Sequence, residues 1–102
     1  MYEAVDALTS RIGLGIMREL ATKGPQTASE LMNSLDLSRR QTLLRTLYRL
    51  EEAGVVVADL APDQRRGRAA VYSLVPEQVS RYFKQLEGFA LGDEIAPPPA
   101  DV

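Results

Sequence analysis

Neither cysteine nor histidine occurs in the 102 residues of this chain. Without cysteine, disulfides, thiol redox sensing and thiolate metal sites are all excluded. The absence of histidine removes the commonest general base and the commonest ligand for transition metals, so only carboxylates remain for either task. The range of chemistry open to the chain is therefore narrow.

Long apolar runs and catalytic motifs are also missing. No apolar run approaches the ~20 residues of a membrane span, and no charged-then-apolar leader precedes a cleavage site, so we expect a cytoplasmic protein without membrane contact. There is no phosphate-cradling glycine loop, nucleophile elbow or pair of metal ligands. Glu51 and Glu52 are adjacent, and on a helix they point about 100° apart, so they cannot converge on one substrate atom. Glu51 could instead pair with a nearby arginine. We predict no enzymatic activity, no metal and no cofactor.

The composition is that of a small soluble domain, with 45% hydrophobic and 25% charged residues. A chain of this length can bury only a modest hydrophobic core, so dimerisation would add to its stability. The net charge of −2 is unevenly distributed, because residues 38–68 hold seven arginines and four acids (+3) and the rest holds five basic and ten acidic residues (−5). Beyond a Debye length of about 8 Å charges are largely screened, so the local field decides whether phosphates are attracted. Such arginines can merely solvate a helix face, but their presence in two separate segments favours a polyanion partner.

Two helical patterns separated by a tight turn occupy residues 27–54. Thr27 and Glu30 have the spacing of a capping box, which predicts a helix over Ala28–Leu35. Ser38 is a second candidate N-cap, before a run in which Leu43, Leu47 and Leu50 form one apolar stripe with Leu44 at its edge. This is the layout of a helix-turn-helix.

The opposite face of the second helix carries polar side chains that suit base recognition. At about 100° per residue, that face holds Gln41, Thr42, Arg45, Arg49 and Glu52. Arginine and amide groups near a helix N-terminus offer the forked donors and acceptors that base edges in a major groove require.

The N-terminal third predicts two helices and a short strand. Residues 1–9 have a weak helical pattern, and Ser10 could cap a helix from Arg11 to Thr22. Gly13 and Gly15 in that helix each cost about 1 kcal/mol relative to alanine, which suggests close approach of another backbone. A dimer contact and packing against the C-terminal helix remain equal alternatives. Gln26-Thr27 could add a very short strand.

A hairpin and a last helix complete the pattern. Val55–Leu60 and Ala69–Val75 read as antiparallel strands, joined by the turn-rich, arginine-containing loop Ala61–Arg68. Pro76-Glu77 opens a helix whose apolar residues recur at spacings of three and four. From residue 92 onward, prolines and acids predict a disordered tail.

The order of these motifs resembles the winged helix-turn-helix of ArsR-like or MarR-like bacterial and archaeal transcriptional regulators. The resemblance rests on residues 38–57, including LEEAGVV at 50–56, with the basic hairpin after them and IMRELATKGPQTASEL (16–31) before them. Leu44 departs from the family pattern, which often has a small polar residue there. The lack of histidine argues against the metal-sensing ArsR-like branch. The resemblance implies an α+β fold that is mainly α, with four to five helices, a two- or three-stranded sheet, a domain over residues 1–91 and a tail over 92–102.

The resemblance also implies a function and a site. The hairpin would be the wing, with residues 61–68 as its loop, and the protein would be a sequence-specific regulator of double-stranded DNA, a dimeric repressor or autoregulator. Base-edge contacts are expected from Arg40, Gln41, Thr42 and Arg45, and the family's recurring recognition-helix arginine matches Arg45. Phosphate contacts are expected from Ser38, Arg39 and Arg49, and backbone or minor-groove contacts from Arg65, Arg66 and Arg68. The expected dimer interface comprises Leu14, Met17, Val79, Tyr82, Phe83, Leu86 and Phe89.

The sequence is also compatible with other functions. A winged helix can serve as a protein-interaction module, its basic face turned to an acidic partner. It can also bind DNA for plasmid partition, recombination or nucleoid architecture. A small-molecule effector could bind between the first and last helices, although no polar cluster marks such a site.

Overall fold

The structure, a computed structural model, describes residues 3–35 and 38–92. Within these ranges the chain forms α1 (Glu3–Thr9), α2 (Arg11–Lys23), β1 (Gln26–Thr27), α3 (Ala28–Ser34), α4 (Arg40–Glu52), β2 (Val56–Ala58), the 3-10 helix η1 (Pro62–Gln64), β3 (Val71–Leu74) and α5 (Pro76–Ala90). The predicted fold class, mainly α with a small hairpin sheet, is confirmed. The predicted disordered tail lies outside the described residues, except for Gly92.

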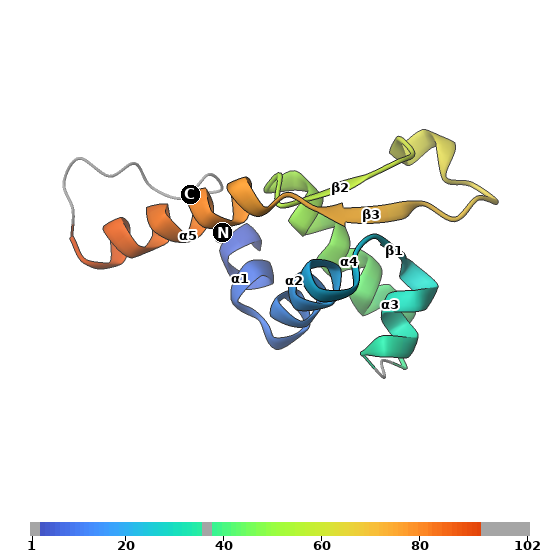
Figure 1. Ribbon diagram of the computed structural model, residues 1–102, viewed down its shortest axis with the longest axis horizontal. Coiled ribbons are helices and arrows are strands. Elements are labelled where there is room, and N and C mark those ends of the chain that lie inside the picture. Colours follow the sequence, from blue (N-terminus) through green and yellow to red (C-terminus); the bar gives the residue numbers. More distant parts are fainter. Residues whose placement is uncertain (1–2, 36–37, 93–102) are drawn as a thin grey trace.

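The sheet is antiparallel and has the order β1-β3-β2, so β3 is its middle strand. Gln26 and Ala58 both pair with Tyr72, from opposite sides. Beyond β2, the backbone N–H of Asp59 donates to the Val71 carbonyl at 3.0 Å, and the Val71 N–H donates to Asp59 Oδ1 at 2.8 Å. Both strands are shorter than predicted, and at the Asp59 end of the pair a side-chain carboxylate replaces one of the backbone acceptors. Figure 1 shows the β2–β3 hairpin extending to one end of the molecule, with α5 at the other end.

The helix-turn-helix begins with the predicted capping box. The Glu30 N–H donates to Thr27 Oγ1 at 3.2 Å, and the Thr27 N–H donates to Glu30 Oε1 at 2.9 Å. The bond from the Thr27 backbone N–H to the carboxylate, and after it hydrogen bonding with the Thr27 side chain, hold the pKa of Glu30 below its ordinary value. The predicted cap at Ser38 is wrong, since α4 begins at Arg40 and Arg39 occupies the N-cap position without a side-chain bond. Ser38 lies one residue too early in the turn for its hydroxyl to act as the cap.

The core lies where α4 meets α1, α2 and the sheet. Leu43, Leu47 and Leu50 are at most 1% exposed, which confirms the predicted stripe. They belong to one cluster with buried residues of α1, α2, α3 and the strands, such as Leu8 and Ile16. Burying apolar side chains of this size stabilises the fold by roughly 1.5–3 kcal/mol each. The cluster thereby fixes which face of α4 points to solvent.

The close backbone approach suggested by the glycines of α2 occurs at Gly13, and its partner is α1. A Cβ atom added at Gly13 would lie 1.7 Å from the Ala7 carbonyl oxygen. Ser10 closes the same corner, because its Oγ accepts from the Gly13 N–H at 2.9 Å and donates to the Ala7 carbonyl at 2.8 Å. Neither of the two alternatives, a second copy or the C-terminal helix, supplies this contact.

A Gly13→Ala substitution is therefore expected to lower the free energy of unfolding by about 1–3 kcal/mol through overpacking, more than alanine's helix propensity restores. Gly15→Ala is the matched control, because its Cβ would meet only the flexible end of Leu35, at 3.2 Å. Urea denaturation of both variants measures the difference. Equal stability of the two would contradict the assigned contact.

Candidate nucleic-acid interface

Five of the ten residues predicted to contact DNA lie in α4, and Arg39 directly precedes it. Arg39, Arg40, Gln41 and Arg45 are exposed, whereas Thr42 and Arg49 are half-buried. Thr42 and Arg49 lie on the flank toward α1, where they line a hollow of about 300 Å³ with Asp6 and Ser10. The solvent-exposed face of α4 is therefore rotated slightly from the face predicted by the helical period, and Gln41 and Arg45 lie at its centre.

A second hollow lies at the N-terminal end of α4. It measures about 430 Å³ and is lined by Arg39, Arg40, Gln41, Thr42 and Arg45. The fold thus brings five of the predicted contact residues onto one open surface. Forked donors gathered in this way can bind both base edges and phosphates.

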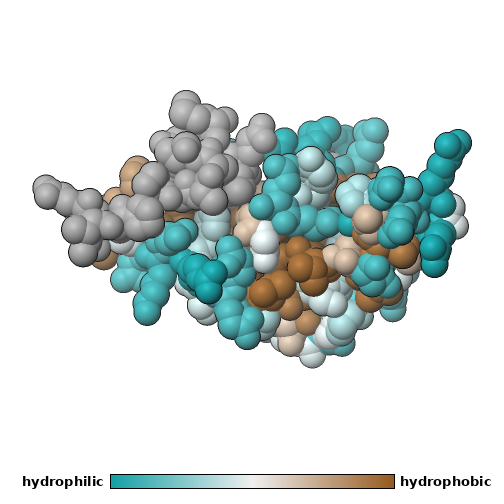
Figure 2. All heavy atoms as spheres, turned by 90° about the horizontal axis from the view of Figure 1, so that it is seen from above, coloured by the Kyte–Doolittle hydropathy of each residue, from teal (hydrophilic) through white to brown (hydrophobic). Residues whose placement is uncertain are grey.

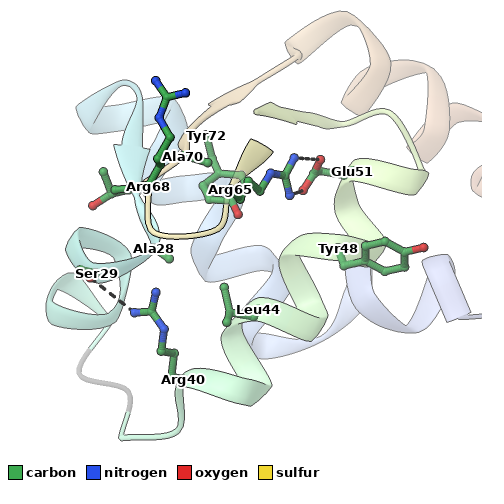
Figure 3. Close-up of a pocket in the computed structure, with 12 residues that line it drawn as sticks. Ala28, Ser29, Arg40, Leu44, Tyr48, Glu51, Arg65, Arg68, Ala70 and Tyr72 are labelled. Atoms are coloured by element: carbon green, nitrogen blue, oxygen red, sulfur yellow. Dashed lines mark hydrogen bonds and ion pairs between the residues drawn. The ribbon is translucent and has the colours of Figure 1, made fainter. Parts of the chain in front are cut away.

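A third hollow, of about 350 Å³, separates α4 from the start of α3 and the wing (Figure 3). Arg40 and Arg68 line it from opposite sides, and Arg40 Nη1 donates to Ser29 Oγ at 3.4 Å. Figure 2 shows that hydrophilic side chains cover the end of the molecule that carries the wing, with an apolar area near the middle of the face in view.

The three arginines of the wing loop do not share one environment. Arg66 and Arg68 are exposed, whereas the side chain of Arg65 is only 21% exposed. Arg65 donates from Nη1 and Nη2 to the two carboxylate oxygens of Glu51, at 2.9 and 2.8 Å, and from Nε to the Leu60 carbonyl at 2.9 Å. The bonds to Glu51 raise the pKa of Arg65, and burial opposes this without cancelling it. The predicted pairing of Glu51 with a nearby arginine is confirmed.

Sequence reasoning missed Tyr48, which is 57% exposed on α4. It follows Gln41 by seven residues and Arg45 by three, so the same 100° rule places it on the solvent face. Leu44, 37% exposed, lies beside it, and both line the hollow against the wing. These two side chains offer apolar and aromatic surface for contacts such as those with thymine methyl groups.

The residues expected at a dimer interface are divided between surface and core. Leu14 and Phe89 are 48% and 47% exposed, whereas Met17 and Tyr82 are 6% and 1% exposed and belong to the core of the single chain. The other three, Val79, Phe83 and Leu86, are half-buried on α5. A surface open to a partner can therefore include Leu14 and Phe89, but not the side chains of Met17 and Tyr82.

A helix pair joined by a tight turn, an exposed polar face on its second helix and a three-stranded antiparallel sheet together define a winged helix-turn-helix. Residues 8–57 match the protein family described as a helix-turn-helix domain. No curated protein sequence matches the chain at a significant level.

Solved structures of transcriptional regulators are similar over most of the chain. A putative MarR-family regulator from Enterococcus faecalis V583 has a TM-score of 0.61 and 25% identity, with 91% of this chain and 82% of that chain covered. A possible transcriptional regulator for arsenical resistance has a TM-score of 0.67 and 21% identity, with 87% and 85% covered. Diamide-treated YodB from B. subtilis has a TM-score of 0.61 and 21% identity, with 96% and 94% covered.

These comparisons confirm the resemblance to winged helix-turn-helix regulators of the ArsR-like or MarR-like type. They indicate a DNA-binding transcription regulator rather than an enzyme. Within the described residues, no helix combines the length and the apolar character needed to cross a membrane.

Proposed function

We propose that this protein is a dimeric, sequence-specific repressor or autoregulator of transcription in the cytoplasm, with residues 1–91 as its DNA-binding domain. In this proposal α4 is the recognition helix and enters the major groove of double-stranded DNA. The observation that carries the proposal is the open surface at the N-terminal end of α4, where Arg39, Arg40, Gln41, Thr42 and Arg45 gather. A groove about 12 Å wide admits one helix, and these side chains would then face base edges and phosphates.

The position of each side chain supports a different role. Arg45 and Gln41, at the centre of the solvent face, would read base edges with Arg40 and Thr42 beside them. Ser38, Arg39 and Arg49 would hold phosphates along the helix, and Arg66 and Arg68 would contact the backbone or minor groove from the wing. The local positive charge of residues 38–68 would supply the non-specific attraction.

Dimerisation is supported by the placement of α5. This helix extends away from the body of the molecule (Figure 1). Its residue Phe89 and Leu14 of α2 are large apolar side chains that remain nearly half exposed. A second copy would cover such apolar surface and place two recognition helices on half-sites about 34–36 Å apart.

The test is binding to the DNA upstream of its own gene and to a random duplex, from about 50 to about 300 mM salt. We expect the upstream site to bind on the order of 10³-fold tighter, and log K to fall linearly with log salt at about −0.9 per phosphate contacted. Equal affinity for both duplexes would favour an architectural role. No duplex binding at the lowest salt would overturn the proposal and favour an acidic protein partner for the basic surface.

A further inference from the structure

The ion pair between Glu51 and Arg65 joins the recognition helix to the wing, as Figure 3 shows. We propose that this pair sets the wing at the position from which Arg66 and Arg68 reach DNA, and that Glu51 and Arg65 are positioning residues that do not contact DNA themselves. The inference rests on the proposed DNA-binding function, since the wing position matters only for a surface that must fit a duplex.

The geometry of the pair restricts orientation as well as distance. Both terminal nitrogens of Arg65 bond to separate oxygens of Glu51, and Nε bonds to the carbonyl of Leu60, the residue just before the wing loop. Three of the five N–H donors of the guanidinium are thus used, in one plane. The group cannot rotate or shift without losing at least one of these bonds.

The guanidinium also rests on a rigid part of the fold. Its central carbon lies 5.7 Å from the ring centroid of Tyr72, which is 5% exposed and stands in the middle strand β3. Arg65 therefore connects α4, the segment that follows β2, and β3 through one side chain. The side chains of Arg65 and Glu51 are only 21% and 20% exposed, so salt screens this pair less than an open surface pair.

The position of the two exposed arginines of the wing loop depends on the position of Arg65. The backbone N–H of Arg68 donates to the carbonyl of Arg65 at 3.0 Å, and Gly67 between them turns the chain with a φ of 71°. In Figure 3 the side chain of Arg68 points away from the pair. Movement of Arg65 relative to Glu51 would thus displace the backbone that carries Arg66 and Arg68.

A direct role for Arg65 makes the opposite prediction. If Arg65 left Glu51 to bind a phosphate, Glu51 would compete with DNA, and its removal would strengthen binding. If the pair positions the wing, removal of Glu51 would weaken binding even though it deletes a negative charge near the DNA. The sign of the effect separates the two roles.

The experiment compares Glu51→Gln with Glu52→Gln in the full chain. Both variants lose one negative charge from α4, and Glu52 is exposed and forms no ion pair among the described residues. We expect Glu52→Gln to bind the specific duplex at least as tightly as wild type. We expect Glu51→Gln to bind on the order of tenfold more weakly at about 0.1 M salt, with a salt slope shallower by up to about two as the contacts of Arg66 and Arg68 are lost.

Two further measurements distinguish a positioning role of the Glu51–Arg65 pair from a general loss of folding stability. Arg65→Lys keeps the charge but loses the planar fork, so it should weaken binding as Glu51→Gln does, whereas a lysine could replace a direct phosphate contact. In the free protein, hydrogen exchange at the amides of Gln64 and Arg68, which bond to Ala61 and Arg65 carbonyls, should be faster in Glu51→Gln and unchanged in Glu52→Gln.

Tighter or unchanged duplex binding by Glu51→Gln, or unchanged exchange in its wing loop, would overturn the inference while the proposed function stands. Wild-type protein that binds no duplex would overturn the proposed function, and the inference with it.

Discussion

Arg45→Ala is expected to weaken binding to the specific DNA site by about 1–3 kcal/mol, which is roughly 5- to 150-fold. The reason is the position of Arg45, which is exposed at the centre of the solvent face of α4 and lines the hollow at its N-terminal end. A guanidinium there can donate two bonds to one guanine, and alanine can donate none. Binding to a random duplex should fall only as far as the loss of one charge requires, so the ratio of specific to random affinity should fall.

Fluorescence anisotropy on both duplexes at one salt concentration measures this ratio. Lys23→Ala is the control, because Lys23 is exposed at the end of α2, outside the helix-turn-helix and the wing and on the opposite side of α2 from Leu14, and its loss changes the net charge equally. An unchanged ratio in Arg45→Ala would show that Arg45 does not read bases, and Gln41 and Arg40 would then be tested in its place.

The largest effect on stability is expected from Leu47→Ala, which should lower the free energy of unfolding by about 2–5 kcal/mol. Leu47 is 1% exposed and lies in the middle of the buried stripe of α4, so the shorter side chain leaves a cavity in the core. Since small domains are stable by only about 5–15 kcal/mol, this loss is a large part of the total.

Leu44→Ala is the control, because it makes the same chemical change on the same helix at a position that is 37% exposed. We expect a change within about 0.5 kcal/mol for Leu44→Ala. Urea denaturation at one protein concentration measures both, since self-association would make the midpoint depend on concentration. Similar losses in the two variants would contradict the assigned orientation of α4.

The elements of this fold could be predicted where the signal is local. Thr27 and Glu30 form their capping box three residues apart, and Leu43, Leu47 and Leu50 repeat within two helical turns. The prediction failed at Ser38, because the turn before α4 sets the cap one residue later, at Arg39. Tyr48 was missed although the helical period places it beside Arg45, because exposed aromatic residues are hard to distinguish from core residues by type alone.

Sequence by itself determined the helix-turn-helix, the hairpin and the polar face of α4, since each follows from spacing within about ten residues and from the period of one element. Only the tertiary structure decided how Gly13 and Arg65 are used. Gly13 accommodates the carbonyl of Ala7, and Arg65 binds Glu51, fourteen residues away in sequence. Both contacts depend on how separate elements pack against one another, and this packing separates Arg65 from the otherwise similar Arg66 and Arg68.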